Sequence, residues 1–279
     1  MDTQNRAVRC REVIDELEAD MEYLGITGVE DKLQEDVGVT IESLRNAGVQ
    51  IWMLTGDKIE TAQCIAISTA LKSPDQTFFV IRECTDSGQL GRELNEFGTH
   101  INNKVDLVLV IDGISLATAL AHHEATFFGV STKAKTVVCC RCSPEQKSIV
   151  TECIKTYTGA KTLGIGDGGN DVGMIQSADI GVGIVGKEGK QAALASDFSI
   201  TKFKYLANLL LWHGRNSYKR GSVMAQFVMH RGLIISIMQT LFSMMYYYVA
   251  IPIFNGFLML GYTTVFTTLP VFALVTFFP

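Results

Sequence analysis

The distribution of charge along the chain constrains its fold more than any other feature. No Asp, Glu, Lys, Arg or His follows Arg231, although the 279 residues include 24 Lys and Arg and 29 Asp and Glu. Residues 232–251 and 257–278 form two apolar runs, each close to the roughly 20 residues that a helix needs to cross a bilayer. A buried helical pair in a soluble protein would keep a polar face toward water, and neither run has one. We therefore expect a polar part followed by a transmembrane hairpin.

The boundary between these parts is expected at residue 202, with residues 203–279 forming a stalk and two membrane helices at about 223–250 and 256–278. The helix that starts near Ala207 is too long for one span, so we expect it to begin as a stalk in the cytosol. Basic residues before the first apolar run predict that it starts on the cytosolic side; they include Lys202, Lys204, Arg215, Lys219 and Arg220.

Composition excludes some classes of function and of compartment. The net charge of −5 and the pI near 5.6 give no reason to expect a nucleic-acid partner. The chain has seven cysteines. An odd number without an apolar leader favours reduced cytosolic thiols over a disulfide framework. Cys139, Cys140 and Cys142 lie close in sequence, but no second cysteine or histidine pair completes a tetrahedral metal set.

Residues 1–202 alternate between short apolar runs and helical patterns. Strands are expected at 23–29, 49–54, 78–81, 106–111, 136–140, 162–165 and 180–184, and helices at 6–22, 37–46, 59–71, after Gly113 and from Ser143, where Pro144 follows an N-cap serine. The weakly patterned residues 72–105, with Pro74 and three glycines, are interpreted as a surface excursion. Such alternation predicts an α/β fold, a Rossmann-like parallel sheet with helices on both faces.

Residues 161–175 contain the strongest candidate site. An apolar run ends in Gly166, and the next residues are Asp167, two glycines, Asn170 and Asp171. The pattern predicts a buried strand that presents carboxylates at its carboxyl end, where ligands bind to open α/β sheets. Carboxylate and amide oxygens are the hard ligands that Mg²⁺ prefers. The alternative is a glycine-rich turn with two solvated acids.

Two other strand ends are expected at the same edge of the sheet. Thr55-Gly56-Asp57 offers a hydroxyl and free backbone amides that suit a phosphoryl oxygen. Lys147, one turn into a helix, offers a cation that would neutralise charge on that group. Taken singly, Thr-Gly-Asp is more often a turn and a lysine is more often solvated. Together with Asp167 they predict a phosphoryl-transfer site.

Several motifs resemble those of P-type ATPases, which belong to the haloacid-dehalogenase superfamily: Thr55-Gly-Asp57, Cys142-Ser-Pro-Glu-Gln-Lys147 and Gly166-Asp-Gly-Gly-Asn-Asp171. Further stretches narrow the resemblance to the phospholipid-translocating type-four flippases, in particular the branch that works without a β-subunit; these are residues 25–34, 52–58, 138–143 and 195–200. Residues 213–220 and the run after them resemble the stalk and the fifth and sixth spans.

The resemblance implies that ATP phosphorylates an aspartate and that the cycle moves an aminophospholipid toward the cytosolic leaflet. It implies that Thr55 and Lys147 contact the transferring phosphoryl group and that Asp167 and Asp171 bind Mg²⁺. The nucleotide site would include Thr55, Gly56, Asp57, Arg141, Lys147, Asn170 and Asp171. An integral membrane protein of Golgi or endosomal membranes, with its incomplete phosphorylation domain (residues 1–202) in the cytosol, is the expected setting.

The departures from the family pattern concern the nucleophile. The family's Asp-Lys-Thr-Gly-Thr motif is absent, as are the nucleotide-binding insertion, the actuator domain and the other spans, so we expect this chain alone to be inactive.

Many members carry a lysine in the fifth span. Here Arg231 stands in that region, either as a lipid-headgroup contact or as a side chain that snorkels to the interface.

Two alternatives to a transporter segment remain open from the sequence. Asp112 ends an apolar strand and could serve a membrane-anchored haloacid-dehalogenase-type phosphatase. Against this, Ile114 occupies the position where the superfamily has an acid or threonine, and a strand-end turn with a capping carboxylate is the structural interpretation. The other alternative is a non-catalytic or dominant-negative fragment that pairs with longer proteins.

Overall fold

The computed structural model describes residues 6–19, 21, 22, 24–28, 33–103, 106–186, 190–248 and 250–277. The chain divides into two compact units, Met1–Leu33 and Gln34–Pro279. The first contains helix α1 (Arg6–Leu17), where a helix is expected. Residues 24–28 have no regular structure, so the described part of the expected strand at 23–29 is wrong; Tyr23 and Val29 lie outside the described residues.

In its described residues the second unit holds seven parallel strands in two sheets, whereas one sheet is expected from the sequence. The first sheet has the order β1-β4-β3-β2, from Ile51–Leu54, Thr136–Cys140, Leu107–Asp112 and Thr77–Ile81. The second has the order β5-β6-β7, from Leu163–Gly166, Ile180–Ile184 and Phe198–Ile200. The α/β class and the parallel direction are confirmed.

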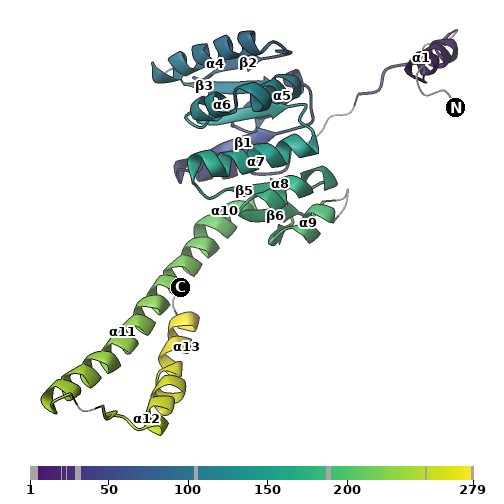
Figure 1. Cartoon of the computed structure of the whole chain (residues 1–279). Helices are drawn as coiled ribbons and strands as arrows, with labels where there is room; N and C mark the ends of the chain where they lie inside the picture. The colour runs from purple at the N-terminus through teal and green to yellow at the C-terminus, as the bar shows by residue number, and fades with distance from the viewer. Residues whose placement is uncertain are drawn as a thin grey trace. The chain divides into compact units, whose positions relative to one another are not determined.

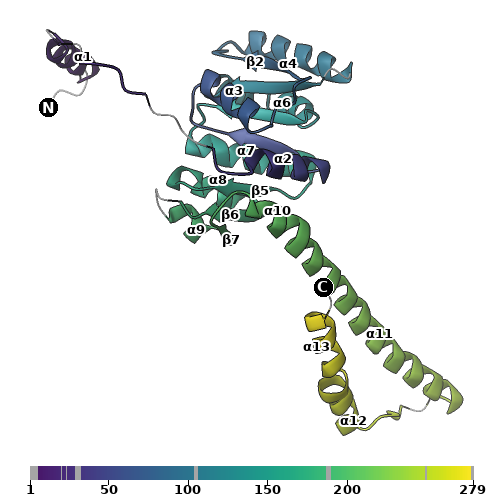
Figure 2. The same ribbon diagram turned by 180° about the vertical axis from the view of Figure 1, so that it is seen from behind.

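Helices cover both faces of the four-stranded sheet. Figure 1 shows α4 (Ser87–Asn102), α5 (Gly113–His122), α6 (Glu124–Ser131) and α7 (Pro144–Thr158) on one side. Figure 2 shows α2 (Val37–Asn46) and α3 (Ile59–Ser68) on the other. The central strands β3 and β4 are completely buried between these layers, as parallel strands covered on both faces require. Smaller helical elements accompany the second sheet: η1 (Gly169–Asp171), α8 (Val172–Ser177) and α9 (Gln191–Ala195).

Helix α4 corrects the interpretation of residues 72–105 as an irregular excursion. Its side chains Leu90, Leu94 and Phe97 are fully buried, and Asp86 caps its first turn by accepting from the backbone N–H groups of Gly88 and Gln89. Burial of one apolar face and an N-cap stabilise this helix despite its glycines.

Two helices are long and apolar enough to cross a membrane, Tyr205–Met245 and Gly256–Thr276, and in the described residues the most apolar stretch of each contains almost no buried residue. The first comprises α10 (Tyr205–Ala207), the π-helical η2 (Asn208–Gly214) and α11 (Arg215–Met245). The second comprises α12 (Gly256–Gly261), the π-helical η3 (Tyr262–Phe266) and α13 (Thr268–Phe277). By length and composition they agree with the expected pair of membrane helices.

Asp179 joins the second sheet to α7. Its carboxylate accepts hydrogen bonds from the backbone N–H of Thr162 at 3.0 Å and from Lys155 and Lys161 at 3.0 and 3.1 Å. These contacts, the Thr162 N–H first, hold the pKa of Asp179 well below its ordinary value of 3.8. A carboxylate with a lowered pKa stabilises the fold above its unfolded-state pKa, and this contribution disappears as the pH falls through the folded-state value.

We therefore expect Asp179→Asn to lower the melting temperature by a few degrees at pH 7, because the amide cannot form the two ion pairs. The difference from the unsubstituted chain should shrink as the pH falls below about 4, where the unfolded-state carboxyl binds its proton. Thermal unfolding between about pH 7 and pH 3 measures this. The exposed Asp75 gives a control, Asp75→Asn, which should change little; a pH-independent Asp179→Asn difference would contradict the assignment.

Candidate phosphoryl-transfer site

The turn after β1 presents a hydroxyl and a carboxylate at the carboxyl end of the strand. Thr55 Oγ1 donates to Asp57 Oδ2 at 2.8 Å and accepts from the Asp57 backbone N–H at 3.1 Å. Gly56 and Asp57 are exposed. The predicted Thr-Gly-Asp turn is thus held in one conformation by its own side chains while its outer surface stays open.

A β-bulge ties this turn to the end of β4. The Thr55 N–H donates to the Cys139 carbonyl and the Cys142 N–H donates to the Thr55 carbonyl, both at 2.9 Å. Two residues of one strand, Cys140 and Arg141, therefore lie opposite the single residue Thr55 of the other, which defines a bulge. Arg141 has a φ of 50° and its N–H donates to the Asp57 carbonyl at 3.0 Å. The bulge brings Arg141 to the Thr-Gly-Asp turn.

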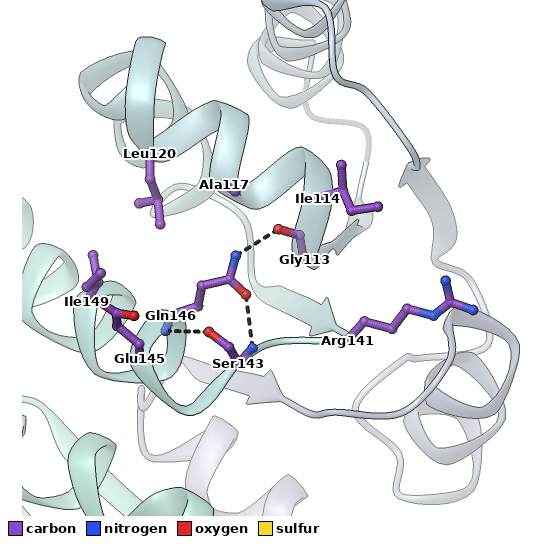
Figure 3. A pocket seen from close by; sticks show the side chains of 9 residues that line it. All are labelled: Gly113, Ile114, Ala117, Leu120, Arg141, Ser143, Glu145, Gln146 and Ile149. Atoms are coloured by element: carbon purple, nitrogen blue, oxygen red, sulfur yellow. Dashed lines mark hydrogen bonds between the residues drawn. The ribbon is translucent and has the colours of Figure 1, made fainter. Parts of the chain in front are cut away.

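The first turn of α7 is locked by a capping box. Gln146 N–H donates to Ser143 Oγ at 3.2 Å, and the Ser143 N–H donates to Gln146 Oε1 at 3.0 Å. The Gln146 amide also donates to the Gly113 carbonyl at 2.7 Å (Figure 3). A Cβ at Gly113 would lie 2.3 Å from the Arg141 carbonyl oxygen, so only glycine fits. The sequence analysis predicts that Ser143 caps the helix, but it does not predict the roles of Gln146 and Gly113. A glutamine three residues after a capping serine is the signal that could have identified Gln146.

An open cavity of about 480 Å³ lies beside this cap, between α5 and α7. Figure 3 shows Ser143, Gln146 and Gly113 bonded at its centre, with the Arg141 side chain directed away from them. Of the predicted site residues only Arg141 lines the cavity, whereas Thr55, Lys147 and Asp167 do not. The cavity therefore adjoins the predicted site without containing it.

Lys147 and Asp171 form a mostly buried ion pair. Lys147 Nζ donates to Asp171 Oδ1 at 2.8 Å, and the two side chains are 10% and 15% exposed. Gly166 permits this approach, because a Cβ there would lie 2.4 Å from the Asp171 Cβ. Lys147 is therefore held by the second sheet's glycine-rich turn and is not a solvated surface lysine.

Asp167 and Asn170 lie exposed at the end of β5, and among the described residues neither side chain has a hydrogen bond or ion pair. The described residues contain no cluster of three or more His, Cys, Asp or Glu side chains that could enclose a metal. Mg²⁺ usually keeps several waters and takes only one or two protein carboxylates. The open Asp167 carboxylate fits that requirement, while Asp171 is shared with Lys147.

The predicted residues fall into two groups at the carboxyl ends of the strands. The Thr55 hydroxyl is bonded to Asp57, a backbone bond joins Asp57 to Arg141, and the ion pair joins Lys147 to Asp171. The chain between Arg141 and Lys147 links the groups. No hydrogen bond or ion pair connects Thr55 with Asp167 in the part of the chain that the structure describes.

Asp112 is a buried structural carboxylate. It is 2% exposed. Its Oδ1 accepts from the Ser115 N–H at 2.9 Å, capping α5, and its Oδ2 accepts from the Glu83 N–H at 3.0 Å. Both oxygens are therefore occupied by backbone donors, which favours the structural interpretation over a nucleophile.

We expect Asp112→Asn to destabilise the α/β unit by about 1–3 kcal/mol, because the amide nitrogen cannot accept from one of the two buried N–H groups. Urea unfolding monitored by Trp52 fluorescence measures this. Asp86→Asn is the matched control, since Asp86 accepts two backbone N–H groups at an exposed N-cap, where asparagine serves equally well. Equal stability of the two variants would contradict the assignment.

Arg231 contacts the second membrane helix. Its Nη1 donates to Thr267 Oγ1 at 2.6 Å and to the Thr263 carbonyl at 3.4 Å. Thr267 is itself 6% exposed. The side chain thus joins the two helices in the region of the π-helical segment η3, which is an arrangement that neither interpretation from the sequence includes.

Comparison with known proteins identifies the family. Residues 193–277 match the family "Phospholipid-translocating P-type ATPase C-terminal". The chain is 53% identical over 271 residues to a probable phospholipid-transporting ATPase IIB of Homo sapiens, covering 97% of this chain and 23% of that protein. It is 53% identical to phospholipid-transporting ATPase NEO1 of Saccharomyces cerevisiae, with the same coverage. It is 42% identical to phospholipid-transporting ATPase 2 of Arabidopsis thaliana, over 96% of this chain and 24% of that protein.

The chain spans about a quarter of the length of these relatives. Within that span the similarity covers both the motifs at the strand ends and the two apolar helices. The chain therefore belongs to the phospholipid-transporting, type-four family of P-type ATPases and contributes an α/β segment and two membrane helices of such an enzyme.

Proposed function

We propose that this chain is the part of an ATP-driven phospholipid transporter that holds the transferring phosphoryl group. The observation that carries the proposal is the ion pair between Lys147 and Asp171, which holds a mostly buried ammonium group at the glycine-rich turn that also contains the exposed Asp167. A preorganised cation in a partly water-excluded site stabilises developing negative charge more than a solvated lysine does.

Each residue has a distinct task in this proposal. The Thr55 hydroxyl and the Lys147 ammonium contact the phosphoryl oxygens. Asp167 and Asp171 hold Mg²⁺, which when bound neutralises charge on those oxygens. ATP binds to the exposed residues Gly56 and Asp57 of the turn and to Arg141 of the bulge. Asn170 supports the Mg²⁺ ligands.

We further propose that the missing nucleophile belongs to a strand between β1 and β5, which would complete a haloacid-dehalogenase-type sheet. Each of these strands ends its own sheet, and one edge of each has no paired strand among the residues that the structure describes. Ile51 of β1 and Leu163 and Ile165 of β5 pack on the same apolar cluster, so the two edges are neighbours. β1 is only half-buried, in contrast to β3 and β4. Free edges are sites for pairing with a further strand.

A peptide in which Asp-Lys-Thr-Gly-Thr follows about five apolar residues, the length of a typical strand, tests this pairing. We expect it to protect the amides of β1 and β5 from hydrogen exchange in the purified chain. The control peptide carries a proline in the apolar run, because proline cannot sit in a central strand. Protection at β2 or β7 instead, or equal protection by both peptides, would refute the proposed position.

The chain alone is proposed to form no phosphoenzyme, because Asp112 is buried and both its oxygens are bonded. Incubation with labelled ATP and Mg²⁺ should leave it unlabelled. In a chimera in which the chain replaces the matching segment of the yeast relative, the same treatment should yield an acid-stable, hydroxylamine-sensitive phosphoprotein. An unlabelled chimera that is folded and membrane-inserted would contradict the proposed site.

The membrane part is proposed to place residues 1–202, as a phosphorylation domain, in the cytosol. The segment from residue 203 to the start of the first span would be the stalk, and Golgi or endosomal membranes are the proposed location. Basic residues at the start of the long helix support this orientation. The names of the relatives, which are phospholipid-transporting ATPases, support transport of a phospholipid. We propose in addition that the lipid is an aminophospholipid and that no β-subunit is required. Uptake of labelled aminophospholipid by cells that carry the chimera and no added subunit tests it.

The unpaired edges of β1 and β5 also favour a second candidate, a non-catalytic fragment that pairs with a longer relative. Co-purification of the tagged chain with the full-length yeast relative would support it. Loss of co-purification when proline replaces Met53, in the middle of β1, would assign the contact to that edge.

A further inference from the structure

We propose that Cys139 and Cys142 form a peroxide-sensitive dithiol beside the phosphoryl-transfer site, which closes to a disulfide. The described residues contain no disulfide and all seven cysteines are free thiols. The pair lies at the bulge between β4 and α7. A disulfide there would change the conformation of the chain that leads from the Thr55 turn to Lys147.

The bulge places the two thiols on one face of the sheet. In a regular strand residues three apart point to opposite faces, but the additional residue opposite Thr55 restores Cys142 to the side of Cys139. Cys139 and Cys142 accordingly share one core cluster, and Cys140 belongs to the cluster on the other face. The intervening Arg141, with its φ of 50°, is the residue that turns the chain back.

The surroundings make the two cysteines chemically different. A hydrogen bond from Cys139 and the positive charge of Lys147 lower the pKa of the Cys142 thiol, against the effects of burial and of Asp112. The hydrogen bond to Cys142, together with complete burial, raises the pKa of Cys139 well above its ordinary value. Burial raises the pKa of Cys140 to about 12. Cys142, 7% exposed, is thus the attacking thiolate and Cys139 is the partner that closes the bond.

The oxidation is balanced with hydrogen peroxide as the oxidant. The Cys142 thiolate attacks one peroxide oxygen, the O–O bond breaks, and the released hydroxide takes up a proton to give water. The product is a sulfenic acid. Cys139 Sγ then attacks Cys142 Sγ; the S–O bond breaks, and the leaving hydroxide combines with the thiol proton of Cys139. Two thiols are oxidised to one disulfide, and one peroxide is reduced to two waters.

Tryptic digestion provides a direct test, because cleavage at Lys135, Arg141 and Lys147 separates the cysteines into peptides 136–141 and 142–147. The folded chain is treated with hydrogen peroxide, its remaining thiols are alkylated, and the digest is analysed by mass spectrometry. We expect the two peptides to be linked and two alkylatable thiols to be lost per chain. Finding both peptides alkylated and unlinked would overturn the proposal.

Two variants identify the partner. Cys140→Ser should retain the link, whereas Cys139→Ser should lose it and accumulate a Cys142 sulfenic acid that dimedone traps. A link that survives Cys139→Ser and disappears in Cys140→Ser would refute the assignment. Because Cys139→Ser could unfold the core, a urea-denatured sample of the chain is treated in parallel. If the cysteines of Cys139→Ser react as fast as those of the denatured sample, the variant is unfolded. The partner of Cys142 is then identified from Cys140→Ser and from fragmentation of the linked peptide.

The functional consequence rests on the proposed function and has a separate readout. In the yeast chimera, peroxide should abolish phosphoenzyme formation, and a thiol reductant should restore it. A linked peptide in a chimera that never becomes phosphorylated would leave the dithiol standing and refute the proposed function. Phosphorylation that persists in fully linked chimera would refute the regulatory consequence.

Discussion

Asp171→Ala is expected to destabilise the α/β unit by about 3–5 kcal/mol, the cost of leaving one member of a buried ion pair without its partner. Lys147 is 10% exposed on its side chain and Asp171 is 15% exposed. The Lys147 ammonium would therefore be left without its partner in a site that water hardly reaches. Urea unfolding followed by Trp52 fluorescence, in a Trp212→Phe background that removes the second of the two tryptophans, measures the change.

The double variant Lys147→Met/Asp171→Leu separates loss of charge balance from loss of packing. Replacing both charges by apolar side chains removes the uncompensated ion, so the double variant should be more stable than Asp171→Ala alone. Asp75→Ala, at an exposed position, controls for removal of a surface carboxylate. A cost below about 1 kcal/mol for Asp171→Ala would mean that the pair behaves like a surface salt bridge.

Lys147→Met is expected to lower phosphoenzyme formation in the yeast chimera by about 10²–10³-fold, the usual effect of removing one preorganised charge donor from a reacting group. The side chain keeps much of the lysine's apolar length, so the apolar packing of α7 is retained, although Asp171 is left without its partner and the variant is less stable. The initial rate of labelling with ATP, in protein of verified folding, measures the effect.

Lys155→Met is the matched control for this substitution. Lys155 lies two turns further along α7 and is 45% exposed in an ion pair with Asp179. It lies outside the proposed phosphoryl site, so its variant should be labelled at the unsubstituted rate. If both variants were labelled equally fast, Lys147 would have a structural role only.

The sequence predicts most of the elements because each has a local cause. Ser143 and Pro144 mark the start of α7, and the uninterrupted apolar run 107–111 marks β3. Helix α4 is not predicted because its glycines indicate an irregular segment, although Leu90, Leu94 and Phe97 have helical spacing. Gly91 has a tertiary reason that no local pattern reveals, since a Cβ there would lie 3.3 Å from the His123 ring.

The division into two sheets could not be predicted, because strand pairing depends on partners distant in sequence. Each apolar run predicts a strand in a parallel sheet. It does not predict that, among the described residues, β1 and β5 each have a paired strand on one side only. For the site, the sequence predicts Thr55 and Asp167 directly after strands and Lys147 in the first turn of a helix, where the structure has them. The direct bond from Lys147 to Asp171 does not, since it depends on the close approach at Gly166.

The π-helical segment Asn208–Gly214 lies within the long helix that leads into the first membrane span. A π-helix bond reaches one residue further than an α-helix bond. Conversion of this segment to α-helix would therefore release one residue and turn everything beyond Gly214 by about 100°, the angle per residue of an α-helix. Arg231 lies beyond that point and faces Thr267. The direction in which this guanidinium points around the helix axis is thus adjustable by a change in helix winding alone, without any bend or break of the helix.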